Sequence, residues 1–189
     1  MKNTTSLKTT LAIALVLIGA QIVVLHLFGQ PPICECGYIK LWEGVVQSSG
    51  NSQHISDWYT PSHIIHGILF FALFTWLFPA WSIARRLFAS LALEISWELV
   101  ENTPMVIDHY RKQALAQGYI GDSILNSVSD TLAMVVGFFA AARLPSWFSV
   151  VLILALEFFT MYIMSDGLLL NIINLIHPFE FISEWQMSR

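Results

Sequence analysis

Charged side chains are scarce in this sequence. Only 12% of its 189 residues are Asp, Glu, Lys or Arg, whereas 56% are hydrophobic, and a soluble domain usually carries about 25% charged residues. This composition excludes an ordinary soluble domain and predicts a single-domain integral membrane protein, with the lipid bilayer as its surroundings. The net charge of -4 is small and no basic patch is present, so we expect no nucleic-acid partner.

Cysteine is also rare, because Cys34 and Cys36 are the only two. A zinc or iron–sulfur site normally needs more ligands at wider spacing, so we predict no metal site here. A disulfide between residues two apart is strained, and an intermolecular bridge, a lipid-exposed pair and plain thiols are the alternatives. The sequence contains no nucleophile motif and no established metal-ligand pattern, and it identifies no cofactor or protein partner.

Long apolar runs, by contrast, are frequent. A helix needs about 20 mostly apolar residues to cross a membrane. We therefore predict an all-α membrane bundle of about five transmembrane helices, at residues 11–28, 62–80, 87–103, 122–142 and 147–164. The C-terminal segment 167–189 has an apolar part too short to span and is predicted to be interfacial.

Basic residues set the expected orientation of these spans. With a cytoplasmic N-terminus, the basic residues next to short cytoplasmic loops are Lys2, Lys8, Arg85, Arg86 and Arg143. The opposite side holds Lys40, Arg111, Lys112 and Arg189. The loop 29–61 and the C-terminus are therefore predicted to face outward. As a less favoured alternative, the first span is a signal peptide cleaved after Ala20, which leaves the rest of the topology unchanged.

Three glutamates interrupt the third span. Glu94, Glu98 and Glu101 fall within an arc of roughly 60° on a helix. A carboxylate at membrane depth costs on the order of 2.5–3.5 kcal/mol, so it normally faces a bundle interior or a water-filled cavity. The stripe therefore predicts a polar site inside the membrane.

Other polar residues lie where the second and fourth spans enter from the same outer side. His63 and His66 are three apart and share a helix face. Asp122, Asn126, Ser129 and Asp130 share a face about 100° wide on the fourth span. We therefore predict that three helices bring acids, histidines and amides together in the outer half of the bilayer.

Structural roles compete with functional ones at several of these positions. His63 and His66 are alternatively interfacial residues with access to water. Asp122 is equally a helix N-cap residue, and Glu101, just before Asn102-Thr103-Pro104, is alternatively a helix-boundary residue. Glu94 and Glu98 are the hardest to explain structurally.

Four segments of the sequence are distinctive: CECGYIKLW at 34–42, NSQHISDWYTPSH at 51–63, Trp97-Glu98 with Glu101-Asn102, and GDSILNSVSD at 121–130. These segments resemble an uncharacterised family of small bacterial inner-membrane proteins found mainly in alphaproteobacteria. The resemblance covers about residues 32–186 and implies a multi-pass inner-membrane protein of undetermined function, with its outward loop in the periplasm. The sequence departs from the family pattern at 165–171, where SDGLLLN replaces an RDNLTLN-like string, so position 165 carries no cation.

A more remote resemblance is to VanZ-like proteins, small helical membrane proteins linked to glycopeptide resistance. It rests on Glu98, Arg111, Asp122, Asn126 and Asp130, and it implies a role in the cell envelope.

These observations lead to three hypotheses about function. The first is a membrane-embedded enzyme acting on a lipid-linked or envelope substrate, with Glu98 as acid or base, Glu101 and Asp130 assisting, and His63 or His66 moving protons or binding a metal. The second is a non-enzymatic envelope binding or assembly protein that uses the loop 29–61. The third is a proton-coupled transporter, which the apolar inner halves of the spans and the lack of an inverted repeat disfavour.

Overall fold

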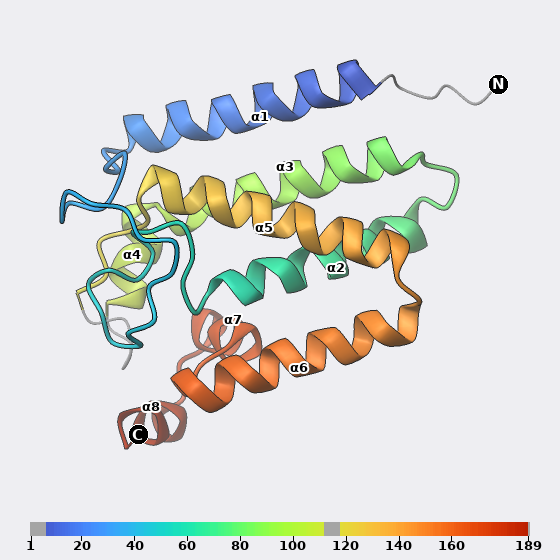
Figure 1. Ribbon diagram of the computed structural model, residues 1–189. Helices are drawn as coiled ribbons and strands as arrows, with labels where there is room; N and C mark the ends of the chain where they lie inside the picture. Colours follow the sequence, from blue (N-terminus) through green and yellow to red (C-terminus); the bar gives the residue numbers. More distant parts are fainter. Residues whose placement is uncertain (1–6, 112–117, 189) are drawn as a thin grey trace.

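The computed structural model describes residues 7–111 and 118–188, and all regular secondary structure in this part of the chain is helical. Five long helices form an up-and-down bundle (Figure 1), which confirms the predicted fold class. They are α1 (Leu7–Leu27), α2 (Thr60–Leu77), α3 (Ile83–Glu101), α5 (Ile124–Arg143) and α6 (Ser146–Met164). The short helices are α4 (Pro104–Tyr110), α7 (Leu168–Ile176) and α8 (Glu180–Met187). The basic residues Lys2, Lys112 and Arg189 lie outside the described residues.

Four of the described helices are long and apolar enough to cross a membrane: α1, α2, α5 and α6. Helix α3 has a similar length of 19 residues, but its two arginines and three glutamates make it too polar for the same classification. It nevertheless packs against α1, α2 and α5 inside the bundle. Burial between neighbouring helices is the usual place for an acidic membrane helix, because its carboxylates then avoid lipid.

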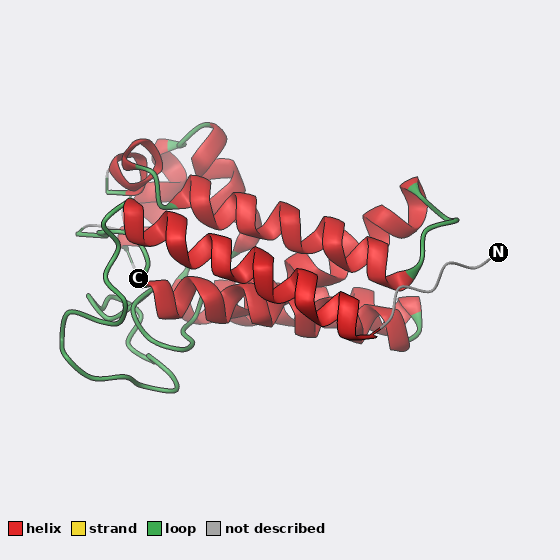
Figure 2. Cartoon of the chain, turned by 90° about the horizontal axis from the view of Figure 1, so that it is seen from above, coloured by secondary structure: helices red, strands yellow, loops and turns green. Residues whose placement is uncertain are grey.

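The irregular and short elements gather at one end of the bundle. The loop between α1 and α2, the three short helices and the C-terminus all lie where α1, α3 and α6 end and where α2 and α5 begin (Figures 1 and 2). The opposite end has only tight connections, at 78–82 and 144–145. The polar termini of α2, α3 and α5 therefore lie together beneath the loop.

Local sequence signals explain where several helices begin and end. Pro61 occupies the first turn of α2, where its missing N–H costs nothing. Ser123 caps α5 by accepting a hydrogen bond from the backbone N–H of Asn126 at 3.1 Å. Glu157 of α6 accepts hydrogen bonds from the N–H groups of Leu168 and Leu169, at 3.1 and 2.8 Å. Glu157, a lone acid in the fifth predicted span, therefore caps the N-terminus of α7.

Helices α2 and α5 approach most closely through two glycines. A Cβ atom on Gly67 would lie 1.9 Å from the backbone oxygen of Met134, and one on Gly137 would lie 2.0 Å from that of Ile64. Small residues let membrane helices come into such contact. Towards the tightly connected end, an apolar cluster of Leu87, Leu91, Met134 and Phe138 fills the interior.

Candidate functional site

Two histidines of α2 meet one glutamate of α3 in the bundle interior. His63 Nδ1 lies 2.7 Å from Glu94 Oε1, and His66 Nδ1 lies 3.0 Å from Glu94 Oε2. The Glu94 side chain is fully buried, and its two oxygens each face one imidazole. The spacing of the two histidines on one helix face, recognised in the sequence, is what allows a single carboxylate to engage both.

Glu98, one turn further along α3, has one oxygen held and one free. Ser127 donates a hydrogen bond to Glu98 Oε2 at 2.6 Å. Glu98 Oε1 is buried without a hydrogen-bond partner among the described residues, and it lies 3.3 Å from His63 Nδ1. A free buried carboxylate oxygen is costly unless a proton, a cation or a ligand engages it.

Helix α1 orients Glu98 through a chain of hydrogen bonds. Gln21 donates to Ser127 Oγ at 2.8 Å, and its carbonyl oxygen accepts from Thr131 Oγ1 at 3.1 Å. Gln21 is the lone amide in the mainly apolar run 11–28, and this polarity is the sequence signal for its role. It is absent from the predicted site residues, because its partner on α5 is known only from the fold.

Asp130 of α5 approaches His63 from the other side of the imidazole ring. Asp130 Oδ2 lies 3.9 Å from His63 Nε2, and Thr60 donates a hydrogen bond to Asp130 Oδ1 at 3.1 Å. His63 is therefore placed between Glu94 at Nδ1 and Asp130 at Nε2. We call His63, His66, Glu94, Glu98 and Asp130 the polar cluster.

The polar cluster borders a cavity of about 760 Å³, which is within the range of small-molecule sites. Its polar wall includes His63, His66 and Asp130, joined by Ser62, Glu101, Asp122 and Asp166. Its apolar wall is formed mainly by Phe70, Leu93, Trp97, Leu168, Ile172, Leu175 and Ile176. The cavity therefore offers a polar end and an apolar side to the same ligand.

The remaining predicted site residues have other places. Glu101 is half-buried in the cavity wall and is not part of the polar cluster. Asp122 also lines the cavity, but its carboxylate accepts hydrogen bonds from Asn102 Nδ2 at 2.6 Å and from the Tyr119 hydroxyl at 2.8 Å. Asn126 donates to the carbonyl of His54 at 2.8 Å. Asp122 and Asn126 therefore hold the loops in place. The N-cap of α5 is Ser123, so the structural role of Asp122 differs from the capping role considered for it.

Comparison with known proteins places the chain in a family. Residues 25–188 match a family model described as a protein of unknown function (DUF2585). The chain belongs to this family. A UPF0314 protein of Rhizobium meliloti (strain 1021) is 53% identical over 169 residues, covering 89% of this chain and 86% of the relative. A UPF0314 protein of Sphingopyxis alaskensis is 46% identical over 179 residues, covering 95% of each chain. No solved structure matches. The predicted membership of an uncharacterised alphaproteobacterial family is confirmed.

The segments that carry the family resemblance meet in space at the loop end of the bundle. Gln53 donates to the carbonyl of Gly121 at 2.7 Å, and Ser123 donates to the carbonyl of Gln53 at 3.0 Å. In the same loop, Asp57 accepts from the backbone N–H groups of Ser52 and Tyr59, at 2.6 and 2.8 Å. Burial raises the pKa of the Asp57 carboxyl, and these hydrogen bonds oppose the rise. The loop is thus fastened to the start of α5, directly over the cavity.

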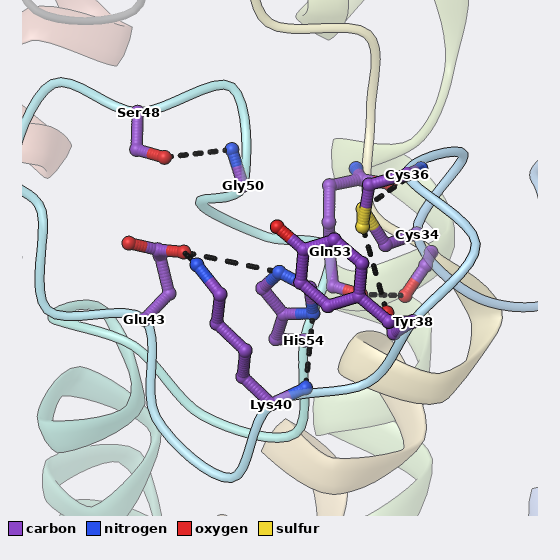
Figure 3. The surroundings of a disulfide bond; sticks show 10 residues. Cys34, Cys36, Tyr38, Lys40, Glu43, Ser48, Gly50, Gln53 and His54 are labelled. Carbon is purple, nitrogen blue, oxygen red and sulfur yellow. Dashed lines mark hydrogen bonds and ion pairs between the residues drawn. A yellow bond between two sulfur atoms is a disulfide. The ribbon is translucent and has the colours of Figure 1, made fainter.

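The two cysteines form a disulfide with each other (Figure 3), which decides between the alternatives left open by the sequence. Beside it, His54 accepts a hydrogen bond at Nδ1 from the backbone N–H of Lys40 at 3.3 Å. Burial lowers the pKa of His54, which fits a neutral imidazole acting as an acceptor. The Lys40 ammonium pairs with the buried Glu43 and holds the pKa of Glu43 below its usual value. The disulfide, the His54 hydrogen bond and the Lys40–Glu43 ion pair are all internal to the loop between α1 and α2, so they stabilise its conformation.

Two further cavity residues were not predicted as site residues. The Tyr59 hydroxyl donates to Asp166 Oδ2 at 3.3 Å, and Asp166 Oδ1 accepts from the backbone N–H of Gly167 at 2.9 Å. Burial raises the pKa of Asp166 to about 6. The sequence places both residues at span ends, but only the fold of the segment after α6 brings them to one cavity wall.

Proposed function

We propose that the protein is an inner-membrane enzyme whose polar cluster acts on a lipid-linked or envelope substrate in the periplasmic half of the bilayer. The observation that carries this proposal is the arrangement of His63 and Asp130 at the polar end of an amphipathic cavity, with Glu94 and Glu98 in contact with His63 behind the cavity wall. Acids and histidines in mutual contact, beside a cavity of ligand size, are a common arrangement at catalytic sites.

Glu98 is the residue to which we assign acid–base chemistry. Its Oε1 atom is free of hydrogen bonds among the described residues, while Ser127 fixes the orientation of its other oxygen. A catalytic carboxylate needs both features, an available oxygen and a fixed direction. His63, whose Nδ1 atom lies 3.3 Å from Glu98 Oε1, lines the cavity and connects Glu98 to it.

The cavity walls support a substrate with a polar head and an apolar tail. His63, His66, Asp130 and Glu101 would face the head, while Phe70, Leu93 and Ile172 would contact the tail. Leu93 and Ile172 each keep more than two-fifths of their surface uncovered by protein, at 41% and 45%, so the apolar wall leaves room for a lipid tail. A lipid-linked molecule could thus enter from the bilayer without leaving its tail in water.

The charge distribution along the bundle supports the orientation. Lys8, Arg85, Arg86 and Arg143 lie at the end opposite the polar cluster. Positively charged residues next to short loops favour the cytoplasm, so the cluster would lie on the periplasmic side. The apolar cluster of Leu87, Leu91, Met134 and Phe138 lies between the two ends, which argues against a transport route through the bundle.

A second candidate function is the binding of an envelope partner by the outward loop. Trp42 and Trp58 stack edge to face, with ring centroids 5.0 Å apart, and Trp42 is exposed. Exposed aromatic side chains are enriched at recognition surfaces. In this alternative the polar cluster has only a structural role.

Replacing Glu98 with glutamine separates these two functions. In a relative's host with its own gene deleted, we expect mass spectrometry of lipids and cell-wall precursors to show one accumulating species, which the wild-type chain removes. Glu98→Gln should lower turnover by about 10²–10⁴-fold, the usual contribution of a general acid or base. The matched control, Glu180→Gln, changes an exposed carboxylate at the start of α8 and should restore the wild-type profile. Full complementation by Glu98→Gln at equal protein levels would rule out the enzymatic role.

A further inference from the structure

We propose that His63, His66 and Glu94 bind one divalent transition-metal ion of the zinc type, with Glu98 beside its open coordination position. Three donor atoms, one from each residue, lie within 4.8 Å of one another. Atoms bound to a common ion at about 2.0–2.1 Å are a little over 3 Å apart in a tetrahedral site. Small shifts of side chains that already face one another would therefore close the site.

The unpaired oxygen of Glu98 is an independent observation that points to a cation. Glu98 is 1% exposed, and its Oε1 atom lacks a hydrogen-bond donor among the described residues. His63 Nδ1 lies within 3.3 Å of this oxygen and 2.7 Å from Glu94 Oε1, but one N–H cannot satisfy both carboxylates. A positively charged ion between them would do so.

The polar cluster also lacks a fixed positive charge. In the described part of the chain, the ion pairs made by lysine and arginine are Lys40–Glu43 and Arg111–Asp108, both outside the cluster. Three carboxylates, Glu94, Glu98 and Asp130, are therefore accompanied only by histidines. Buried charges are normally paired or coordinate metals, and a divalent ion would balance two of these acids.

The surroundings of the donors resemble the outer shell of a metal site. A histidine that binds a metal through Nδ1 carries its proton on Nε2, and that N–H usually faces a carboxylate or a carbonyl group. His63 Nε2 faces Asp130 Oδ2 at 3.9 Å. Ser127 holds the second oxygen of Glu98, so that the first remains directed towards His63.

The donor set selects the class of ion. Two imidazoles and one carboxylate suit zinc and neighbouring transition metals, whereas calcium and magnesium prefer oxygen ligands alone. His63 and His66 line the cavity, so an ion and a water molecule can reach them. A site with three protein ligands and one open position is typical of catalytic zinc.

The chemical role of the metal ion rests on the proposed function. A bound ion would activate a water molecule or polarise a substrate at the polar cluster. Ion binding itself can be tested without knowledge of the substrate. The second group of donors close enough for a metal is Cys34, Cys36 and His54, but its sulfur atoms are joined in the disulfide. That group provides the control.

The test is zinc binding by the full chain in detergent, stripped with a chelator and titrated with zinc chloride against a competing chromophoric chelator. We expect one zinc ion per chain, counted by elemental mass spectrometry. His66→Ala and Glu94→Gln should each weaken binding by more than the about 10–100-fold that loss of an outer-shell partner costs. The double variant Cys34→Ser/Cys36→Ser should bind like the wild type. Cobalt substitution gives a second readout, a visible ligand-field absorption that His63→Ala should abolish.

Two results would overturn the metal site: a wild-type chain that binds no zinc, or unchanged affinity in His66→Ala and Glu94→Gln. Size-exclusion profiles identify any variant that fails to fold, and His66→Ala is the mildest because its side chain is partly exposed. Zinc binding together with full complementation by Glu98→Gln would support the metal site and rule out the enzymatic function. Absence of zinc binding together with failed complementation by Glu98→Gln would rule out the metal site and support the enzymatic function.

Discussion

Gly137→Ala is expected to destabilise the bundle by more than about 3 kcal/mol, although it adds only one methyl group. The new Cβ atom would lie 2.0 Å from the backbone oxygen of Ile64, and a backbone atom cannot move away as a flexible side chain can. Gly67→Ala should have a similar effect, because its Cβ atom would lie 1.9 Å from the oxygen of Met134. Both substitutions force α2 and α5 apart, and with them His63 and Asp130.

Gly19→Ala is the matched control for this prediction. Gly19 lies within α1, and a Cβ atom there would meet nothing within 4 Å. Alanine favours a helix over glycine by about 0.5–1 kcal/mol, so Gly19→Ala should be neutral or slightly stabilising. Thermal or denaturant unfolding in detergent, followed by tryptophan fluorescence, measures the three variants. If Gly137→Ala left the stability unchanged, α2 and α5 would have to lie further apart than the 2.0 Å contact at Gly137 requires.

Asn102→Ala should produce the second large effect, a loss of about 2–4 kcal/mol in the free energy of unfolding. The Asn102 amide donates to the carbonyl of Glu98 at 2.9 Å and to Asp122 Oδ2 at 2.6 Å. Its oxygen accepts from the backbone N–H of Asp122 at 2.7 Å. Asn102 is almost fully buried, so alanine would leave the backbone N–H of Asp122 unpaired and remove a donor from the Asp122 carboxylate, both away from water.

A double-mutant cycle tests whether Asp122 acts through Asn102. If Asp122 anchors the start of α5 to the end of α3, Asp122→Ala should cost about as much as Asn102→Ala, and the double variant little more than either. Asn171→Ala is the control, since the amide oxygen of Asn171 has no hydrogen-bond partner among the described residues. Fully additive losses would show that Asp122 and Asn102 stabilise the protein independently.

Helical periodicity was enough to predict the bundle and the faces of its helices. Glu94 and Glu98 are buried on one side of α3, where a stripe repeating every three to four residues must lie. The two histidines share a face of α2 for the same reason. The ends of α2, α3 and α5 also agree with the predicted spans to within a few residues, because proline, serine and charged residues mark them.

Contacts between helices could not be predicted in the same way. Nothing in the sequence says that Glu94 rather than Glu98 meets both histidines, because this depends on how far α2 slides along α3. The close crossing at Gly67 and Gly137 fixes α2 against α5 rather than against α3, and its geometry is a property of the packed bundle. The roles of Gln21, Asn102 and Glu157 escaped prediction for the same reason, since each bonds to a partner in a different element of the fold.

We propose that water reaches the cavity beside the polar cluster from the periplasm and not from the cytoplasm, and side-specific cysteine labelling tests this most directly. In a Cys34→Ser/Cys36→Ser background, Ser62→Cys places a thiol in the cavity wall, and Ala80→Cys places one in the exposed connection between α2 and α3. We expect a membrane-impermeant maleimide to label Ser62→Cys only from the periplasm and Ala80→Cys only from the cytoplasm, in inverted vesicles. Labelling of Ser62→Cys from the cytoplasm, with or without labelling from the periplasm, would contradict a cavity that water reaches only from the periplasm.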